Sequence, residues 1–283
     1  MKTIGEILKL SQKHLADQGI ANARRSAEEL LAFHLKISRL DLYLNFEMPI
    51  QEKELVGIRE SLKRRSKGEP LEYIFGKMKF FQLELVIDPS VLIPRQETEI
   101  FISKIVKVIK ARPHHGKVAW DICCGSGCLG LGLKKSLPDL AVILSDLSSR
   151  ALAIAKLNCE NNGLQAEFLH GDLLQPFEGR KADFILFNPP YVTQKEYEAL
   201  DAEVRNFEPK EALVAGPNGV EFYERLAREL PSYLNPGAKL FFEIGSTQAE
   251  QIKNIFSSSC WTHLVVEKDW AGHDRFVFLE YFS

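Results

Sequence analysis

The sequence predicts an α/β protein in which a largely parallel sheet, covered by helices on both faces, follows a small domain made only of helices. Two observations support this prediction. Beyond residue 98, short apolar runs alternate with longer stretches of helical periodicity, which is typical of strand–helix–strand units. Roughly the first 70 residues show helical periodicity alone. A chain of 283 residues is long enough for both domains.

The N-terminal part repeats apolar residues every three or four positions, as the buried face of a helix requires. Two capping boxes, Thr3 with Glu6 and Ser26 with Glu29, are expected to start helices. In such a box a hydroxyl accepts from the backbone N–H three residues on, and the glutamate reaches back. We therefore expect a helical domain over residues 1–72. Its periodic segments are 4–15, 30–35 and 55–62.

Residues 73–98 change to short segments rich in Phe and Val, which Gly76 and Asp88-Pro89 interrupt. This pattern predicts a hairpin-like connector. The main domain is expected over residues 99–283, and its last two strand-like runs predict an antiparallel hairpin at the edge of the sheet. The expected strands are 117–122, 141–145, 166–170, 182–187, 238–244, 262–267 and 275–281, and the expected helices are 127–136, 148–162 and 219–234.

Charge and hydropathy restrict the class of protein. A net charge of -2 and a pI near 6.4 provide no overall basic field for a nucleic acid. The basic run 63–67 is interpreted as a solvated helix end or as a contact with an acidic partner or RNA. The N-terminus does not resemble a signal peptide, and no apolar run approaches the roughly 18 residues that cross a bilayer. We therefore expect a cytoplasmic protein with no membrane partner.

Cysteine usage points to reduced thiols. Three of the five cysteines crowd residues 123–128, without a further pair of ligands at metal-binding spacing. Buried thiols in a reducing compartment explain this arrangement better than zinc does. No metal is therefore expected.

A strand, a tight glycine turn and the start of a helix occupy residues 118–130. Gly125 and Gly127 let the backbone approach a ligand closely, and Gly130 completes a G-x-G-x-x-G pattern. The pattern alone fits a nicotinamide cofactor as well as S-adenosylmethionine. Asp121 favours the second, because its carboxylate can hold the ammonium group that only a methionine moiety carries. The turn residues expected to contact this cofactor are Cys123, Cys124, Gly125, Ser126 and Gly127.

Acidic residues also follow the next two strands. Asp146 ends the strand after the glycine turn, where its carboxylate can accept hydrogen bonds from both hydroxyls of a ribose. Asp172 follows the third strand, where it can accept from an adenine amino group while Leu173 covers the ring. The alternative for Asp172 is a cap on a helix or turn. With Asp121, these residues predict a site for S-adenosylmethionine.

The most specific signal is an apolar strand, 182–187, that leads into Asn188-Pro189-Pro190-Tyr191. Ligands of open α/β sheets bind at such strand ends. The Asn188 side-chain oxygen and the Pro189 carbonyl can accept both N–H bonds of a planar NH2 group, which aims its delocalised lone pair at a methyl donor. The prolines stiffen the turn, and Tyr191 offers a flat face for stacking. The alternative is an Asn-Pro turn that only closes a strand.

With both motifs in place, the chain resembles the class I methyltransferases, and more narrowly the HemK/PrmC-type glutamine methyltransferases of peptide-chain release factors. The resemblance extends over most of the chain, and segment 92–99, Leu-Ile-Pro-Arg-Gln-Glu-Thr-Glu, is its most specific further part. Asn-Pro-Pro-Tyr alone also looks like adenine-N6 and guanine-N2 methyltransferases. The other matching segments are 69–76, 207–209 and 272–275.

This resemblance implies a seven-stranded, Rossmann-like methyltransferase domain behind a helical domain that recognises the substrate. It implies S-adenosyl-L-methionine as cofactor and S-adenosyl-L-homocysteine as product. The implied partners are class I release factors, methylated at N5 of the glutamine in their Gly-Gly-Gln motif. For Phe81 it implies a substrate contact, with core packing as the alternative. Arg95 contacts the partner or braces the Asn188 turn, and sequence does not choose between these roles.

Two other functions compete with this interpretation. A nucleic-acid methyltransferase acting on an exocyclic amine would use the same Asn188 chemistry on a flipped base. It predicts a basic cleft and a target-recognition domain, which the near-neutral charge and short N-terminal part do not supply, so a nucleic acid is not the expected substrate. A nicotinamide oxidoreductase would need a catalytic His or a Tyr–Lys pair, and none is evident.

Overall fold

The computed structural model describes residues 2–282, and these fold into two compact units. The first unit contains the chain up to Gly76 together with Asp201–Phe207. The second contains Lys77–Leu200 and the chain from Glu208 onward. The stretch 73–98, which the sequence suggests as a connector, is therefore divided between the two units at Gly76.

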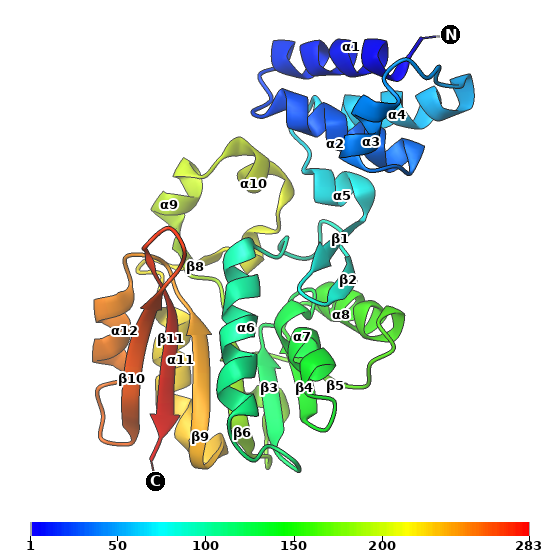
Figure 1. Cartoon of the computed structure of the whole chain (residues 1–283). Coiled ribbons are helices and arrows are strands. Elements are labelled where there is room, and N and C mark those ends of the chain that lie inside the picture. Colours follow the sequence, from blue (N-terminus) through cyan, green and yellow to red (C-terminus); the bar gives the residue numbers. More distant parts are fainter. Residues whose placement is uncertain (1, 283) are drawn as a thin grey trace. The chain divides into compact units, whose positions relative to one another are not determined.

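The first unit is helical, as the sequence predicts (Figure 1). The three periodic segments form helices α1, α2 and α4. Their apolar faces share one core, which buries Leu8, Leu30, Leu31 and Ile58. Two short helices, α3 and α5, have too few residues to show a period. The bounds are α1 (Ile4–Asp17), α2 (Ala23–Leu35), α3 (Arg39–Leu44), α4 (Glu52–Arg65) and α5 (Leu71–Phe75).

One of the two predicted capping boxes is confirmed and the other is wrong. Thr3 caps α1, and its hydroxyl accepts from the N–H of Glu6 at 3.3 Å while the Glu6 carboxylate accepts from the N–H of Thr3 at 3.0 Å. Helix α2 instead begins one turn before Ser26, after Asn22 in the left-handed conformation. Ser26 is buried inside the helix, where its hydroxyl accepts from Arg65 Nε at 3.3 Å. A distant partner, not a helix start, explains this serine.

Two residues of the basic run 63–67 serve the first unit itself. Arg64 forms an ion pair with Glu69 at 2.5 Å. Arg65 is buried, donates to the Glu69 carbonyl at 2.8 Å and forms an ion pair with Glu203 at 2.8 Å. These contacts attach the short helix α10 (Ala202–Phe207), distant in sequence, to the end of α4.

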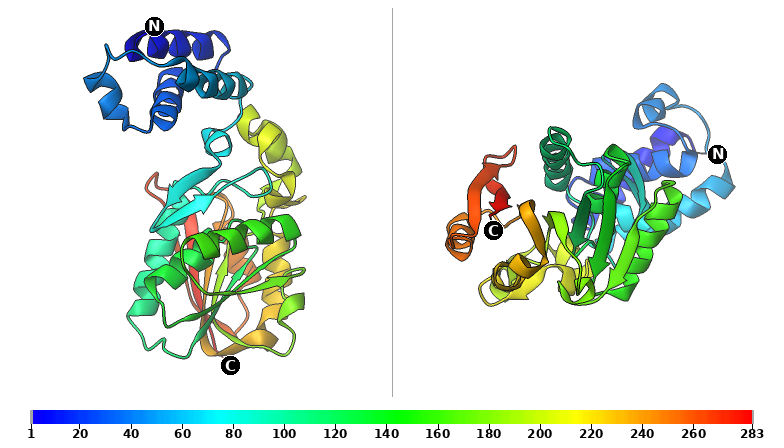
Figure 2. Two further views of the ribbon diagram at one scale, coloured as in Figure 1. Left: turned by 90° about the vertical axis from the view of Figure 1, so that its right-hand side faces the viewer. Right: turned by 90° about the horizontal axis from the view of Figure 1, so that it is seen from below.

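The second unit is built on a seven-stranded sheet with the order β10-β11-β9-β6-β3-β4-β5 (Figures 1 and 2). Strand β11 runs antiparallel to both β10 and β9, and the remaining pairs are parallel. This confirms the predicted sheet and its antiparallel hairpin at one edge. The strands are β3 (Val118–Ile122), β4 (Ala141–Asp146), β5 (Glu167–His170), β6 (Ala182–Phe187), β9 (Leu234–Glu243), β10 (Trp261–Lys268) and β11 (Asp274–Tyr281).

Helices cover both faces of this sheet, as Figure 2 shows. Helices α6, α7 and α8 pack on one face, and α11 and α12 pack on the other. The sequence reading missed α6, because its first turn lies in the stretch assigned to the connector. The bounds are α6 (Gln96–Lys110), α7 (Cys128–Ser136), α8 (Ser149–Asn161), α11 (Glu221–Glu229) and α12 (Ala249–Ile255). No helix within residues 2–282 is both long and apolar enough to cross a membrane.

The element bounds around residues 219–243 differ from the prediction. The expected helix 219–234 ends as α11 at Glu229, and a 3₁₀ turn, Leu230–Tyr233, follows because a proline in its first turn cannot continue an α-helix. Strand β9 begins at Leu234, earlier than expected, and its pairing with β6 shifts register before Lys239. The Asn-Pro-Gly sequence at this irregularity is untypical of a strand, so the sequence pattern did not predict where the strand begins.

A small hairpin, β1 (Lys77–Phe80) and β2 (Leu83–Val86), packs on α7 and α8. The Asn158 side chain on α8 accepts from the N–H of Val86 at 2.7 Å and donates to its carbonyl at 3.1 Å. The same amide donates to the Ser126 carbonyl at 3.0 Å. One fully buried asparagine therefore fixes the hairpin to the glycine turn between β3 and α7.

The remaining short elements lie between β6 and α11. After β6, the chain forms a second small two-stranded pair, this one parallel, and two short helices before it returns to the sheet. These elements are β7 (Val192–Thr193), α9 (Gln194–Ala199), α10, a 3₁₀ turn at Lys210–Ala212 and β8 (Val214–Gly216).

Candidate active site

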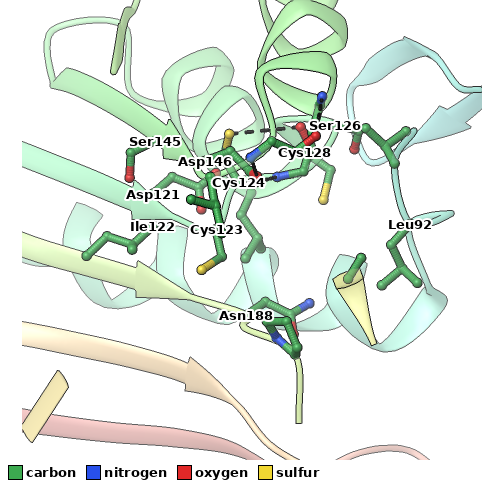
Figure 3. Close-up of a pocket in the computed structure, with 18 of the residues that line it drawn as sticks. Leu92, Asp121, Ile122, Cys123, Cys124, Ser126, Cys128, Ser145, Asp146 and Asn188 are labelled. Carbon is green, nitrogen blue, oxygen red and sulfur yellow. Dashed lines mark hydrogen bonds between the residues drawn. The ribbon is translucent and has the colours of Figure 1, made fainter. Parts of the chain in front are cut away.

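A cavity of about 380 Å³ lies at the carboxyl ends of β3, β4 and β6 in the second unit (Figure 3). This is the edge of an open α/β sheet at which ligands bind, and the volume is typical of a small-molecule site. The glycine turn forms one side, and Asn188 and Leu92 lie opposite it. The cavity therefore joins the two motifs that the sequence singles out.

The glycine turn has an unusual backbone. Cys123, Gly125 and Gly127 adopt φ values of 61°, 54° and 80°, a region that disfavours residues with a side chain. Cys123, Cys124, Gly125 and Ser126 line the cavity, as expected. Gly127 is not among the lining residues, and a Cβ there would lie 3.0 Å from the Leu131 side chain. The need for glycine at 127 therefore comes from its left-handed backbone and from packing.

Asp121 lies at the cavity with only 1% of its surface exposed. Its Oδ2 accepts from the N–H of Gly130 at 2.7 Å. Burial, opposed by the hydrogen bond from Gly130 and assisted by the charge of Asp146, raises the pKa of this carboxyl to about 7. An unpaired buried carboxylate of this kind favours a cationic ligand, since a cation would offset the cost of its desolvation.

Gly130 allows α7 to approach β3 at Asp121. A Cβ at this position would lie 2.8 Å from Asp121 Oδ2 and 2.9 Å from Asp121 Cβ. We expect Gly130→Ala to displace the Asp121 carboxylate, weaken cofactor binding about tenfold and lower the free energy of unfolding by about 1–3 kcal/mol. Calorimetric titration and thermal unfolding measure the two effects.

The matched control is Gly132→Ala in the same helix, because a Cβ there would meet the Ile102 side chain at 3.2 Å and lies away from Asp121. This control should bind cofactor like the wild type. Equal affinities of the two variants would contradict the proposed steric role of Gly130.

The acid that ends β4 and the acid that follows β5 also line the cavity. Asp146 accepts from the N–H of Gly125 and from the N–H of Ser148, both at 2.8 Å, and burial raises its pKa. These bonds fix the carboxylate plane. Asp172 forms an ion pair with Arg225 on α11 at 2.7 Å, a partner that the sequence did not suggest.

Apolar residues complete this end of the cavity. Leu173, in the left-handed conformation with φ 46°, is buried and lines it as predicted. Phe222 from α11 also lines it, and the sequence reading missed this residue because nothing local separates it from a core aromatic. Both side chains are suited to cover a flat ring.

The three clustered cysteines are free thiols that line the cavity. Burial raises the pKa of each thiol above its usual value, so they stay protonated and weakly nucleophilic at neutral pH. Residues 2–282 contain no group of His, Cys, Asp or Glu side chains arranged to hold a metal ion. The three clustered cysteines are Cys123, Cys124 and Cys128.

Asn188 reaches the cavity because of strand register. Phe187, the last residue of β6, pairs with Ile122 of β3 and with Phe242 of β9. Asn188 therefore follows at the same level as Cys123, where the glycine turn begins. Asn188 and Pro190 line the cavity. The two motifs, about 60 residues apart in sequence, meet because parallel strands end at the same edge.

The other two residues of the motif lie outside the lining of the cavity. Pro189 is buried in the turn. Tyr191 packs against the apolar core that α11 and α12 form with the sheet, and its carbonyl accepts from Gln248 Nε2 at 2.9 Å. Burial raises the pKa of the Tyr191 hydroxyl. This packing supports the turn from behind.

The two further residues expected at the substrate differ in their placement. Arg95 lines the cavity. Phe81 does not, and instead lines a separate hollow beside α6 together with Ile100 and Trp270. Phe81 has φ 50°, and its N–H donates to Glu99 Oε1 at 2.5 Å. This position of Phe81, outside the cavity of the second unit, favours a packing role over a contact with the substrate.

The structure contains a buried pair that the sequence did not predict. Thr98 lines the cavity, and its hydroxyl donates to Glu243 Oε2 at 2.8 Å. Glu243 is 2% exposed, and burial raises its pKa to about 7. The sequence could have indicated Glu243, because this acid ends an apolar strand just as Asp146 does.

Comparison with known proteins agrees with this geometry. The chain matches the family models "Methyltransferase small domain" over residues 96–208 and "PrmC N-terminal domain" over residues 6–76. Release factor glutamine methyltransferases of Geobacter sulfurreducens and Chlamydia trachomatis serovar D are 38% and 42% identical to it. Each alignment covers 97% of this chain and, respectively, 95% and 93% of the relative.

A solved structure shares the fold at low identity. It is the 16S rRNA N2 G1207 methyltransferase of T. Thermophilus with AdoMet and guanosine, at a TM-score of 0.52 and 15% identity. The match covers 73% of this chain and 50% of that one. Such a fold is compatible with several substrates, so this likeness does not choose among them. The identity to the curated relatives over nearly the whole chain shows that the chain belongs to the release factor glutamine methyltransferase family.

Proposed function

We propose that this methyltransferase transfers a methyl group from S-adenosyl-L-methionine to N5 of the glutamine in the Gly-Gly-Gln motif of class I release factors. The observation that carries the proposal is that Asn188 lines the same cavity as Asp121 and Asp146. The relatives' names, which specify release factors and glutamine, support the choice of substrate. S-adenosyl-L-homocysteine is then the second product.

The residues around the cavity fit this cofactor. The buried Asp121 carboxylate is matched to the ammonium group of its methionine part. Asp146, held in plane by two backbone N–H groups, is matched to a ribose diol. At the far end, Asp172 is matched to the adenine amino group, and Leu173 and Phe222 to the faces of the ring.

We assign the chemistry at the acceptor nitrogen to Asn188, which lines the cavity, and to the main-chain carbonyl of the adjacent Pro189, whose ring is buried in the turn. An amide nitrogen is a poor nucleophile because its lone pair is delocalised, so orientation is the main requirement. Acceptance of its two N–H bonds by Asn188 Oδ1 and the Pro189 carbonyl orients the nitrogen and stabilises the positive charge that develops there. The bound cofactor supplies an electrophilic methyl group on a sulfonium. Pro190 and the packed Tyr191 keep the two acceptors in place.

We assign recognition of the release factor's surface to the helical domain, residues 1–72. Its short helix α3 exposes two leucines, Leu40 at 68% and Leu44 at 72%, and Met48 beyond it is 44% exposed. Leu40 and Leu44 are four positions apart and share one face of the helix, and an exposed apolar face is typical of a protein interaction site. This patch suits an apolar face of a protein partner.

The charge of the cavity supports a protein substrate over a nucleic acid. Among its described lining residues, Arg95 is the only cation, whereas four are acids. Three of these acids are assigned to the cofactor, and a lining with a single cation offers little attraction to phosphates. The net charge of the whole chain is -2. The acids are Asp121, Asp146, Asp172 and Glu211.

The test is incubation with methyl-labelled S-adenosylmethionine and, in parallel, unmodified release factor, total RNA and unmethylated DNA, followed by mass mapping. We expect label on the glutamine of the Gly-Gly-Gln motif. Label confined to nucleic acid would be compatible with the role proposed for Asn188 but would contradict the proposal of a protein substrate.

A further inference from the structure

Two separate segments form the cavity wall opposite the glycine turn. The first is 90–95, ahead of α6, and the second is 208–212, which follows α10. Leu92, Pro94 and Arg95 line the cavity from the first segment, and Glu211 lines it from the second. More than 100 residues of sequence separate these segments, so a specific contact must join them.

Glu208 makes that contact. Its side chain is 1% exposed, and Oε2 accepts from the N–H of Ile93 at 3.1 Å while Oε1 accepts from Arg95 Nη2 at 2.5 Å. A carboxylate is costly to bury unless hydrogen bonds and an opposite charge compensate it. Here both compensating groups come from the other segment, so the buried carboxylate joins the two segments.

The same contact orients Arg95. The Glu208 side chain is buried, whereas that of Arg95 is 37% exposed. One nitrogen of the guanidinium is therefore held by Glu208, and other N–H groups are accessible to a ligand. A guanidinium carries five N–H donors in a rigid plane and has no acceptor. An arginine fixed in this way offers donors to the cavity that it lines.

We propose that Glu208 is a positioning residue for the substrate, which acts by holding the Arg95 guanidinium where it donates to main-chain carbonyls of the loop that carries the acceptor glutamine. This inference rests on the proposed function. Glycines beside the glutamine have no side chains, so recognition of such a loop depends on its main-chain groups. The acids that line the cavity offer carbonyl oxygens no hydrogen bond when ionised, whereas Arg95 does.

A double-mutant cycle on the full chain tests this role. The variants are Glu208→Gln, Arg95→Gln and the double variant, and Glu167→Gln, which alters an exposed pair with Arg180 at 2.7 Å, is the matched control. The measurements are kcat and KM for an unmodified release factor, the Kd for S-adenosylmethionine and the unfolding midpoint.

We expect Glu208→Gln and Arg95→Gln each to raise the KM for the release factor about tenfold, with cofactor Kd within about twofold of the wild type. Because Glu208 acts through Arg95, the double variant should have the KM of Arg95→Gln alone. The Glu167→Gln control should match the wild type. An unchanged KM in Glu208→Gln would overturn the proposal.

Two other results would also overturn it. If the effects of Glu208→Gln and Arg95→Gln multiply, or if cofactor affinity falls in parallel with KM, the carboxylate has only a structural role. Should Glu208→Gln fail to fold, Arg95→Lys decides, because it keeps the charge beside Glu208 but removes the planar fork. A raised KM supports the proposal, and a wild-type KM rejects it. Failure of the proposed function is seen separately, as a wild-type protein that leaves the release factor unmodified.

Discussion

Replacing Asn188 by alanine is expected to lower the rate of methyl transfer by about 10²- to 10³-fold or more, while cofactor affinity stays close to that of the wild type. The reason is geometric. Asn188 lines the cavity at the end of β6, where its side-chain oxygen can accept an N–H bond from a planar NH2 group. Without this acceptor, the nitrogen loses both its orientation and the stabilisation of its developing charge.

Single-turnover transfer to an unmodified release factor and calorimetric titration of S-adenosylmethionine separate the two parts of this prediction. Asn161→Ala, at the exposed end of α8, is the matched control and should behave like the wild type. An Asn188→Ala variant that keeps more than about a tenth of the wild-type rate would refute the assigned role, because loss of one preorganised contact at the reacting centre costs far more.

Replacing Asp121 by asparagine is expected to weaken cofactor binding about 10- to 100-fold, because a charged hydrogen bond to an ammonium group contributes roughly 1.5–3 kcal/mol. The side chain is nearly isosteric, so the Gly130 N–H keeps an acceptor at 121. The cavity shape is therefore preserved, and the loss reports on charge. Calorimetric titration of the wild type and of Asp121→Asn measures it.

The same residue predicts a pH dependence. The usual aspartate pKa is 3.8, and burial raises that of Asp121 in the folded protein to about 7. An ammonium group binds the ionised carboxylate, so cofactor affinity should rise as pH increases toward 7 and then level off. Above about pH 8 it should fall again, as the α-amino group of the ligand loses its proton. In Asp121→Asn the rise below pH 7 should disappear.

Stability without cofactor should change in the opposite direction. Between pH 4 and 7, roughly, folded Asp121 keeps a proton that the unfolded chain has lost, so this residue makes unfolding easier as pH rises through that window. At pH 8, Asp121→Asn should therefore unfold at a higher temperature than the wild type while binding cofactor more weakly. Loss of both stability and affinity would show that Asp121 serves the fold and not the ligand.

Local patterns were sufficient for much of this protein. The alternation of apolar runs and helical periods indicated the sheet, because burial on one or two faces imposes a period on each element. Backbone requirements made Gly125 recognisable as a turn residue, and it lines the cavity in a left-handed conformation. Parallel strands end at one edge, so Asp121 and Asn188 were expected together, and both line one cavity.

Local patterns failed where a distant residue decides the environment. Ser26 has the sequence context of a helix cap, yet it binds Arg65, 39 positions away. For Phe81 the family resemblance implied a substrate contact, with core packing as the alternative, and the residue lies beside α6, outside the lining of the cavity. The propensity of a residue is a weak preference that tertiary contacts override, and neither contact has a local signature.

The sequence by itself determined the class of fold, the family resemblance and the residues with which the cofactor and the acceptor nitrogen are expected to interact, because each depends on a short motif with its own backbone geometry. Only the tertiary structure decided how the site is supported. Glu208 holds Arg95 across 113 residues, and Glu243 accepts from Thr98 across 145. Both acids are buried, and burial is a property of the assembled core, which no single segment contains.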